Sequence, residues 1–206
     1  YDIDVSEYDV NRHFFLSHFF RDNYNAWLQN LPYIESQLQI QQIEVWVVNK
    51  QNNYTEARNI VALMDLAEGY GPDGEPNYYA EESTLSPARG NNMPASNDRN
   101  ALYGSLAADN RIRKLSTVES AMLGISDASY TFQAGRDYVT MESARPLSDR
   151  EYSINRELGY ISLNSPLRND EILAVAFTYT YRGETFTVGE LSTDVSAPNV
   201  LMLKML

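Results

Sequence analysis

The first strong pattern along the chain is an apolar stripe between residues 11 and 31. Its members recur at spacings of three and four residues and are Leu16, Phe20, Tyr24, Trp27 and Leu31. This spacing places them on one face of an α-helix. Pro32 cannot continue helical hydrogen bonds, so the pattern predicts a helix over 11–31. Because the stripe is rich in aromatic side chains, we expect the helix to dock on a sheet.

Two runs that are apolar on both faces follow, at 43–48 and 60–66. A strand with two apolar faces is covered on both sides, so we expect two central strands. The connection between them contains Asn52 and Asn53, which favour a turn. It is also too short for the usual parallel crossover. The pattern therefore predicts that the two strands are antiparallel neighbours.

Residues 69–100 break the regular pattern. They contain Gly-Pro-Asp-Gly-Glu-Pro at 71–76, Ser-Pro at 86–87 and Gly-Asn-Asn at 90–92. Such clusters are typical of loops, and long loops in compact domains are often functional or packed against a partner. We therefore expect a long irregular loop at 69–100.

Short helices and strands fill the rest of the chain. Two helices are predicted over 101–107 and 118–123. Six strands are predicted over 138–143, 152–154, 160–164, 172–181, 185–188 and 200–205. Gly183 favours a two-residue hairpin turn. Large and small side chains alternate along 172–181, so we expect the large face in the core and the small face against a second layer.

These elements predict an α+β fold, with an antiparallel β-sandwich-like core, an N-terminal helix and two short central helices. We expect a single soluble domain over 1–206, with a weak internal domain boundary near residue 127. The sequence begins with Tyr1 rather than Met, which indicates a fragment of a larger chain. No apolar run approaches the roughly 18 residues of a membrane helix, so we expect no direct membrane span in this fragment.

Composition and charge exclude several classes of protein. With 206 residues, 43% of them hydrophobic, the chain can bury its own core, which excludes a disordered tail. The absence of cysteine excludes a disulfide scaffold, a thiolate nucleophile and cysteine-ligated metals. A formal net charge of −12 argues against nucleic acid as a partner.

The two histidines, His13 and His18, are the first candidates for a metal or pH-sensitive site. Metal-binding pairs on a helix are usually three or four residues apart, so that both rings point the same way. At a separation of five the rings diverge. We therefore favour two histidines at the surface or boundary of the helix.

Carboxylates suggest two further sites. Glu44 and Asp65 interrupt apolar strands and could share a face, as a glycosidase pair does. The alternative is an exposed polar position or a salt bridge, for example with Arg58.

A second group of carboxylates lies in the irregular loop and comprises Glu68, Asp73, Glu75, Glu81 and Glu82. It contains a fragment of a calcium-loop pattern, but Pro and Tyr occupy other ligand positions, so we favour a solvated acidic loop.

The sequence contains no recognisable catalytic motif. A nucleophile elbow, a phosphate-binding loop and a dinucleotide fingerprint are all missing. We therefore expect no enzyme and assign no catalytic residue, no metal and no cofactor. Tyr78 and Tyr79 could form a platform for a sugar or peptide, and Asn53-Tyr54-Thr55 fits a glycosylation acceptor.

Six long phrases of the sequence are more specific than any of these motifs. They are RHFFLSHFFRDNY at 12–24, IEVWVVN at 43–49, RNIVALMDL at 58–66, LGYISLN at 158–164, DEILAVAFTY at 170–179 and VGELSTD at 188–194. In this order they resemble a segment of the SprA/Sov family, the giant outer-membrane translocon of the Bacteroidetes type IX secretion system, which is also associated with gliding motility. The resemblance covers most of the chain except the loop at 69–100.

The resemblance implies a place in the cell envelope, associated with the outer membrane on its periplasmic or extracellular (cell-surface) side. It implies a non-catalytic structural or interaction domain in protein transport. Its partners would be the rest of the translocon chain, secretion accessory proteins and cargo proteins. The alternative is a surface glycan-binding β-sandwich module built around Tyr78 and Tyr79.

The translocation path in this family is a giant β-barrel. The present segment lacks the repeat of about ten residues that lipid-facing barrel strands require. We therefore expect a soluble insert or appended domain rather than a piece of barrel wall.

Overall fold

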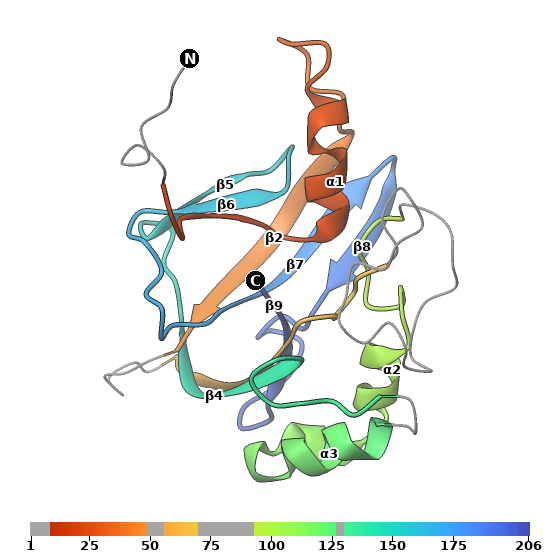
Figure 1. Cartoon of the computed structure of the whole chain (residues 1–206), viewed down its shortest axis with the longest axis vertical. Coiled ribbons are helices and arrows are strands. Elements are labelled where there is room, and N and C mark those ends of the chain that lie inside the picture. Colours follow the sequence, from red (N-terminus) through yellow and green to blue (C-terminus); the bar gives the residue numbers. More distant parts are fainter. Residues whose placement is uncertain (1–8, 49–55, 70–92, 127–129) are drawn as a thin grey trace.

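The computed structural model describes residues 9–48, 56–69, 93–126 and 130–206. Within these ranges the fold is α+β and consists mostly of strands (Figure 1). The elements are β1 (His13–Phe15), α1 (His18–Trp27), β2 (Leu38–Val47), β3 (Arg58–Leu63), α2 (Leu102–Ala107), the 3₁₀ helices η2 (Asn110–Arg113) and η3 (Leu115–Thr117), α3 (Val118–Ile125), β4 (Tyr138–Pro146), β5 (Tyr152–Asn155), β6 (Tyr160–Leu163), β7 (Leu173–Tyr181), β8 (Glu184–Val188) and β9 (Leu201–Met205).

The main sheet closes into a small five-stranded barrel. Neighbouring strands follow the order β2–β4–β3–β9–β7, and β7 pairs back with β2. β8 extends the sheet as a hairpin on β7. Most of these pairings are antiparallel, but β3 and β9 are parallel, with Ile60 opposite Leu201. The core is therefore a mixed barrel, and the expected antiparallel sandwich is wrong.

Small side chains inside the ring explain why the sheet closes. The inner core contains Ala62, Ala144, Ala174 and Ala176 beside larger residues such as Trp46. Five strands enclose little space, and small inward side chains let opposite walls approach. This core includes no residue of α1, α2 or α3, so the strands and the turn after β8 enclose it.

A second and larger core lies on the outer face of the barrel. It packs β2, β3, β7 and β9 against α1, α2, α3 and the small sheet. β7 separates the two cores, because Val175 and Phe177 face the outer core whereas Ala174 and Ala176 face the inner one. The predicted alternation of large and small residues is thus confirmed. It also explains why the strand runs are apolar on both faces.

β2 and β3 are not neighbours, so the prediction of an antiparallel pair is wrong. β4 lies between them and pairs with both. The end of β2 lies opposite Arg145 and the start of β3 lies opposite Ala144. The ends to be joined are therefore separated by only one intervening strand, about 10 Å or twice the spacing of adjacent strands. A short connection permits this crossing.

The N-terminal helix is shorter than the apolar stripe predicts. Residues 13–15 form β1, which pairs with β6. Ser17 has extended backbone angles, and its side chain accepts a hydrogen bond from the backbone N–H of Phe20 at 3.3 Å. It therefore caps the helix. Three residues are too few for periodicity to distinguish a strand from a helical turn.

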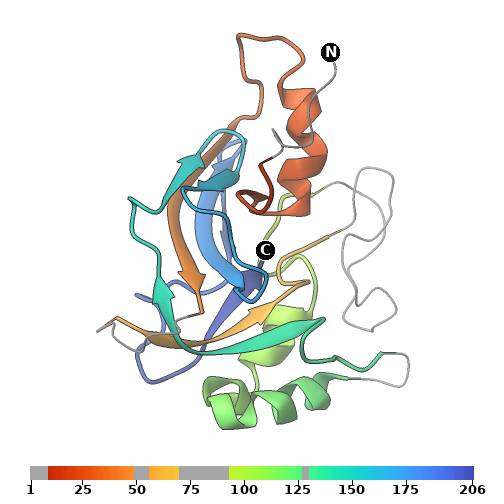
Figure 2. The same ribbon diagram turned by 60° about the vertical axis from the view of Figure 1, so that its left-hand side comes forward.

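A small antiparallel sheet covers one side of the barrel, with the strand order β1–β6–β5. α1 lies at one end of the molecule, whereas α2 and α3 lie at the other (Figure 2). The two short central helices and the six strands beyond residue 138 all occur as predicted. Arg182 and Gly183, with φ of +51° and +85°, form the predicted two-residue hairpin.

Of the irregular loop expected at 69–100, residues 70–92 lie outside the described ranges. Its final part packs closely against the barrel. The hydroxyl of Tyr179 donates to the carbonyl of Ala95 at 2.7 Å. Asn100 Nδ2 donates to the carbonyls of Asp65 and Glu68 at 2.8 and 3.0 Å. These contacts fasten residues 95–100 to β7 and to the segment that follows β3.

Gly159 sets the distance between the small sheet and α1. It has φ of +68°, and a Cβ at this position would overlap the ring of Phe20, which is fully buried. Gly159→Ala should lower the free energy of unfolding by about 2–4 kcal/mol, from backbone strain together with displacement of Phe20. Urea denaturation measures this loss.

Gly183→Ala is the matched control, because Gly183 also has a positive φ but open space around it. Backbone strain alone should cost about 1 kcal/mol there. Equal losses in the two variants would show that the packing of Phe20 does not depend on Gly159.

Candidate functional site

Glu44 is a structural acceptor inside the barrel. It lies opposite Ala176 on β7 and therefore faces the inner core. Its carboxylate accepts hydrogen bonds from the Ser192 hydroxyl at 2.8 Å, from the Ser192 N–H and from Trp46 Nε1 at 3.1 Å. These donors occupy both carboxylate oxygens and hold the turn after β8 in place. The arrangement does not match the glycosidase pair considered with Asp65.

Arg58 does not pair with either carboxylate. Its guanidinium donates to the carbonyl oxygens of Ser192, Val195 and Asn199, with the shortest distance, 2.6 Å, to Val195. Arg58 thus fastens residues 192–199 to the start of β3. Asp65 is buried beyond the end of β3.

Glu68 is buried, so the prediction of a solvated acidic loop is wrong for this residue. Glu68 is 1% exposed, and Lys204 is 3% exposed. Glu68 Oε1 lies 2.6 Å from Lys204 Nζ and accepts a hydrogen bond from the backbone N–H of His18 at 3.1 Å. A carboxylate at a helix N-terminus is favourable. The pair joins β9, the segment after β3 and the first turn of α1.

The remaining members of that acidic group, Asp73, Glu75, Glu81 and Glu82, lie outside the described ranges. Tyr78, Tyr79 and Asn53-Tyr54-Thr55 lie outside them as well. These positions therefore stay predictions from the sequence.

The two histidines lie on different elements, His13 on β1 and His18 at the start of α1. His13 Nδ1 lies 2.8 Å from the hydroxyl of Ser162. His18 Nδ1 is buried and has no hydrogen-bond partner among the described residues. Burial lowers the pKa of His18 below 6.5, and Lys204 and Arg21 act in the same direction against the raising effect of Glu68. Across the described ranges, no cluster of three metal-ligating side chains occurs.

A second buried ion pair, which the sequence patterns did not reveal, joins Glu190 to Arg113. The guanidinium contacts both carboxylate oxygens, at 2.6 and 2.7 Å. Glu190 also accepts from the N–H of Met202 at 2.9 Å and from the hydroxyl of Tyr103 at 3.3 Å. Burial, together with the nearby Glu190 charge, raises the pKa of Tyr103. The network links α2 and η2 to β9.

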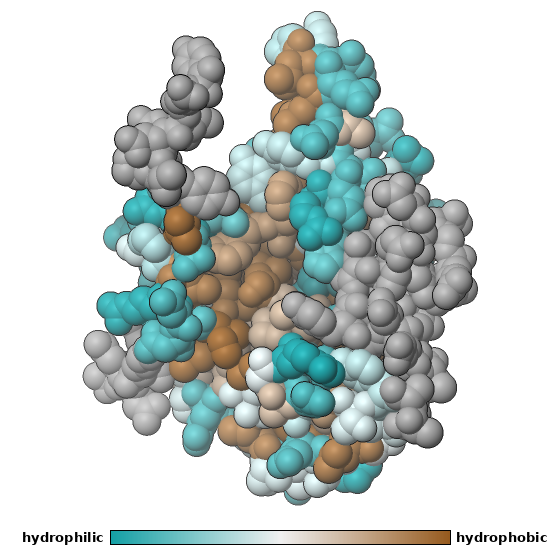
Figure 3. Space-filling view, in the orientation of Figure 1, coloured by the Kyte–Doolittle hydropathy of each residue, from teal (hydrophilic) through white to brown (hydrophobic). Residues whose placement is uncertain are grey.

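These buried charges hold elements together, so a binding site is better sought at the surface. One groove of about 460 Å³ lies between α1 and the small sheet, and we call it the aromatic groove. Its lining residues are His13, Phe14, Phe15, Arg21, Tyr24, Asn25 and Tyr160. Figure 3 shows that apolar residues gather in the middle of the face that carries β1 and α1.

Three rings fix the shape of the aromatic groove. Phe15 meets Tyr24 and Tyr160 edge to face, with ring centroids 5.3 and 5.9 Å apart, and Tyr24 lies 6.3 Å from Tyr160. All three side chains are half-buried. Mutual packing therefore holds the rings rigid while part of each remains accessible, which suits a contact with another molecule.

The sequence placed these aromatic residues in the core. Tyr24 belonged to the predicted helix stripe and Tyr160 to a predicted strand. Only the pairing of β1 with β6 brings them together.

Comparison with known proteins does not identify a function, because no family model matches the chain and no curated protein matches its sequence. None of the helices in the described ranges is long and apolar enough to span a bilayer.

Removing one charge of the buried Lys204–Glu68 pair should strongly destabilise the folded chain. Lys204→Met leaves Glu68 buried without its counter-ion, which should lower the free energy of unfolding by about 3–5 kcal/mol. The double variant Lys204→Met/Glu68→Gln removes both charges and keeps an acceptor for the N–H of His18, so it should be clearly more stable than Lys204→Met. Urea denaturation compares the three proteins.

Arg111→Met, which breaks the solvent-exposed pair with Asp109, is the control and should lower the free energy of unfolding much less than Lys204→Met. A double variant no more stable than Lys204→Met would contradict the role of the buried charge.

His18 should make stability depend on pH. Because its pKa is lowered in the folded chain, the unfolded chain binds a proton more readily below pH 6.5. The contribution of His18 to the free energy of unfolding is fully present above pH 6.5 and is lost as the pH falls below it. The free energy of unfolding should therefore decrease from pH 7 to pH 5, and His18→Gln should reduce this decrease. Urea midpoints at the two pH values test this, with the exposed His13→Gln as control; an unchanged decrease in His18→Gln would refute it.

Proposed function

We propose that this chain is a non-catalytic structural and interaction domain of an outer-membrane secretion translocon, related to the type IX system and gliding motility. The proposal starts from the six phrases that resemble the SprA/Sov family. The observation that supports it best is their placement in the fold. The phrases at 12–24 and 158–164 supply the two walls of the aromatic groove, and the other four supply β2, β3, β7 and the turn after β8.

The physical character of the chain suits such a role. Two cores and three charged contacts, of which Lys204–Glu68 is fully buried, hold the covering segments to the barrel, which favours a rigid surface. The net charge of −12 disfavours non-specific adhesion to acidic cargo or lipid. The aromatic groove then offers a specific contact for the rest of the translocon chain, an accessory protein or a cargo protein. The proposed location is the cell envelope, on the periplasmic or extracellular side of the outer membrane.

The test uses the bacterium that encodes the chain, with the full-length protein expressed from its own locus. Tyr24→Ala/Tyr160→Ala should reduce the type IX cargo found in the medium by about tenfold or more, because central aromatic contacts dominate interfaces. The amount of the protein in the outer membrane should stay unchanged. Tyr33→Ala, at an exposed tyrosine outside the groove, is the control.

Normal secretion and normal gliding in a strain that lacks residues 1–206 of this chain would refute the proposed function. Loss of the full-length protein from the membrane in the double variant would be detected by the membrane measurement, and milder Tyr→Phe variants would then replace the alanine variants.

A surface glycan-binding module is the second candidate. The aromatic groove favours it, because Tyr24 and Tyr160 lie beside the polar side chains of Arg21 and Asn25, a combination suited to stacking and hydrogen bonding with a sugar. A glycan array with the purified chain separates the two candidates. A glycan signal that is lost in Tyr160→Ala would favour the module.

A further inference from the structure

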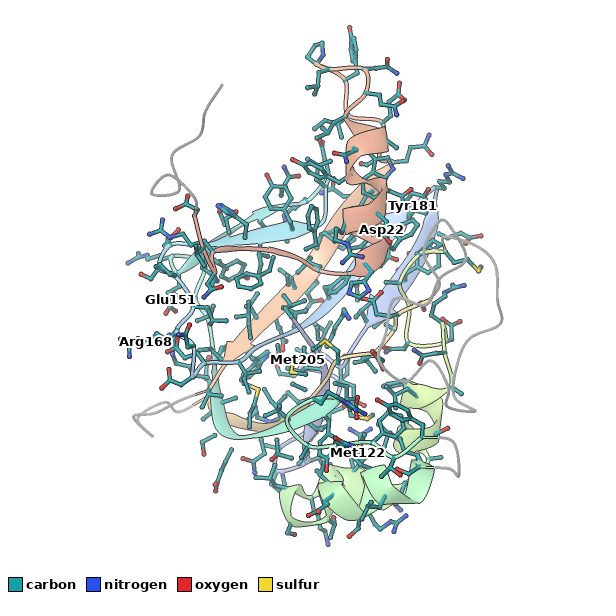
Figure 4. All side chains as sticks on the ribbon, in the orientation of Figure 1. Asp22, Met122, Glu151, Arg168, Tyr181 and Met205 are labelled. Atoms are coloured by element: carbon teal, nitrogen blue, oxygen red, sulfur yellow. The ribbon has the colours of Figure 1, made fainter. Side chains whose placement is uncertain are left out.

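A cleft at one end of the barrel differs in chemistry from the rest of this acidic protein. It measures about 450 Å³ and lies where β2 and β4 end, where β7 begins and where the chain leaves β6. Three arginines line it, Arg145 at the end of β4, Arg150 in the turn that follows and Arg168 after β6, together with the carboxylates of Glu151 and Glu171. We call it the arginine cleft. Glu151 and Arg168, on its rim, lie close together at the same edge of the molecule in Figure 4.

Apolar side chains form the floor of the arginine cleft, although most of its accessible lining is polar. Val47, Leu163 and Leu173 are buried at its base, and Val48, Leu147 and Leu167 are half-buried around them. An ion alone would leave the exposed parts of Val48, Leu147 and Leu167 in contact with water. A ligand with an aliphatic side chain would cover them, which is favourable.

One of the three arginines is already paired. Arg145 contacts both carboxylate oxygens of Glu151, at 3.1 and 2.8 Å. Glu151 also accepts from the N–H and the hydroxyl of Ser148, at 2.9 and 3.0 Å. This pair forms a fixed, neutral part of the wall.

The other two guanidinium groups are available to a ligand. Neither Arg150 nor Arg168 makes a side-chain hydrogen bond or ion pair with any residue in the described ranges, and both are exposed. Their backbones are nevertheless held in place. Asn164 Nδ2 donates to the carbonyl of Arg150 at 2.6 Å, and Glu171 accepts from the N–H of Arg168 at 3.1 Å. The rim is therefore ordered while its charges remain unpaired.

We propose that the arginine cleft binds an acidic peptide segment in which carboxylates flank one aliphatic side chain. Guanidinium groups match carboxylates in bidentate geometry, and the apolar floor takes the aliphatic side chain. Nucleic acid does not fit this cleft. Two free arginines can neutralise only a few backbone phosphates, and the net charge of −12 repels the rest of the polyanion. The proposal is independent of the translocon function and of the aromatic groove.

The test is a selection of peptides of eight residues with random flanks and a central Leu, Ile or Val, against the purified 206-residue chain. Enriched peptides should carry Asp or Glu on both sides of the central residue. Their affinity, measured by fluorescence anisotropy, should fall about tenfold or more with Arg150→Gln/Arg168→Gln. It should also fall several-fold when Ser replaces the central peptide residue, since the floor then loses its apolar contact.

Arg111→Gln/Arg182→Gln removes the same amount of charge elsewhere and should leave the affinity unchanged. Four outcomes would overturn the proposal: no enrichment, enrichment of neutral or basic peptides, equal binding by the two double variants, or insensitivity to the central residue. Binding to phosphatidylglycerol vesicles that is lost only in Arg150→Gln/Arg168→Gln would assign the cleft to lipid headgroups instead of a peptide. Urea denaturation of both variants shows that they remain folded.

Discussion

The alternation of large and small side chains along β7 is the constraint on which the rest of the structure depends. β7 pairs with β2, β8 and β9, so it takes part in closing the barrel and also forms part of its outer wall. Its inward Ala174 and Ala176 keep the ring narrow, and its outward Val175 and Phe177 support the large core. Gly189 also lies against Ala176, with a would-be Cβ only 3.1 Å from the Cβ of Ala176. A larger residue at either position would force the barrel open.

A few charged contacts, buried or half-buried, hold the covering segments to the barrel. Lys204 with Glu68 fastens α1, Arg113 with Glu190 fastens α2 and η2, and Glu44 with Ser192 fastens the turn after β8. Helices make their backbone hydrogen bonds within themselves, so side-chain contacts such as these set how they sit against the barrel. Each contact costs desolvation, and in return it sets one position for the segment.

The small sheet connects this framework to the two surfaces proposed for binding. Tyr160 at the start of β6 lines the aromatic groove, and Leu163 at its end lines the arginine cleft. Its strands have only three or four residues each, so they depend on packing against the rest of the molecule. Ile161, which is fully buried in the outer core, and the close approach of Gly159 to Phe20 anchor them to the barrel and α1. The two surfaces therefore lie on one element that the core holds in place.

Local sequence patterns were enough to predict most of the elements and the faces that they bury. Periodicity located α1, α2, α3 and the strands other than β1, which lies within the predicted helix. The alternation along β7 indicated two layers, and Gly183 indicated the hairpin, because these features depend on neighbours in the chain. Only the tertiary structure decided the place of β4 between β2 and β3, the parallel pairing of β3 with β9, the burial of Glu68 and the convergence of Tyr24 with Tyr160 and of Arg150 with Arg168. Each of these depends on contacts between residues far apart in sequence. Their energies arise only when the barrel closes, so no local pattern records them.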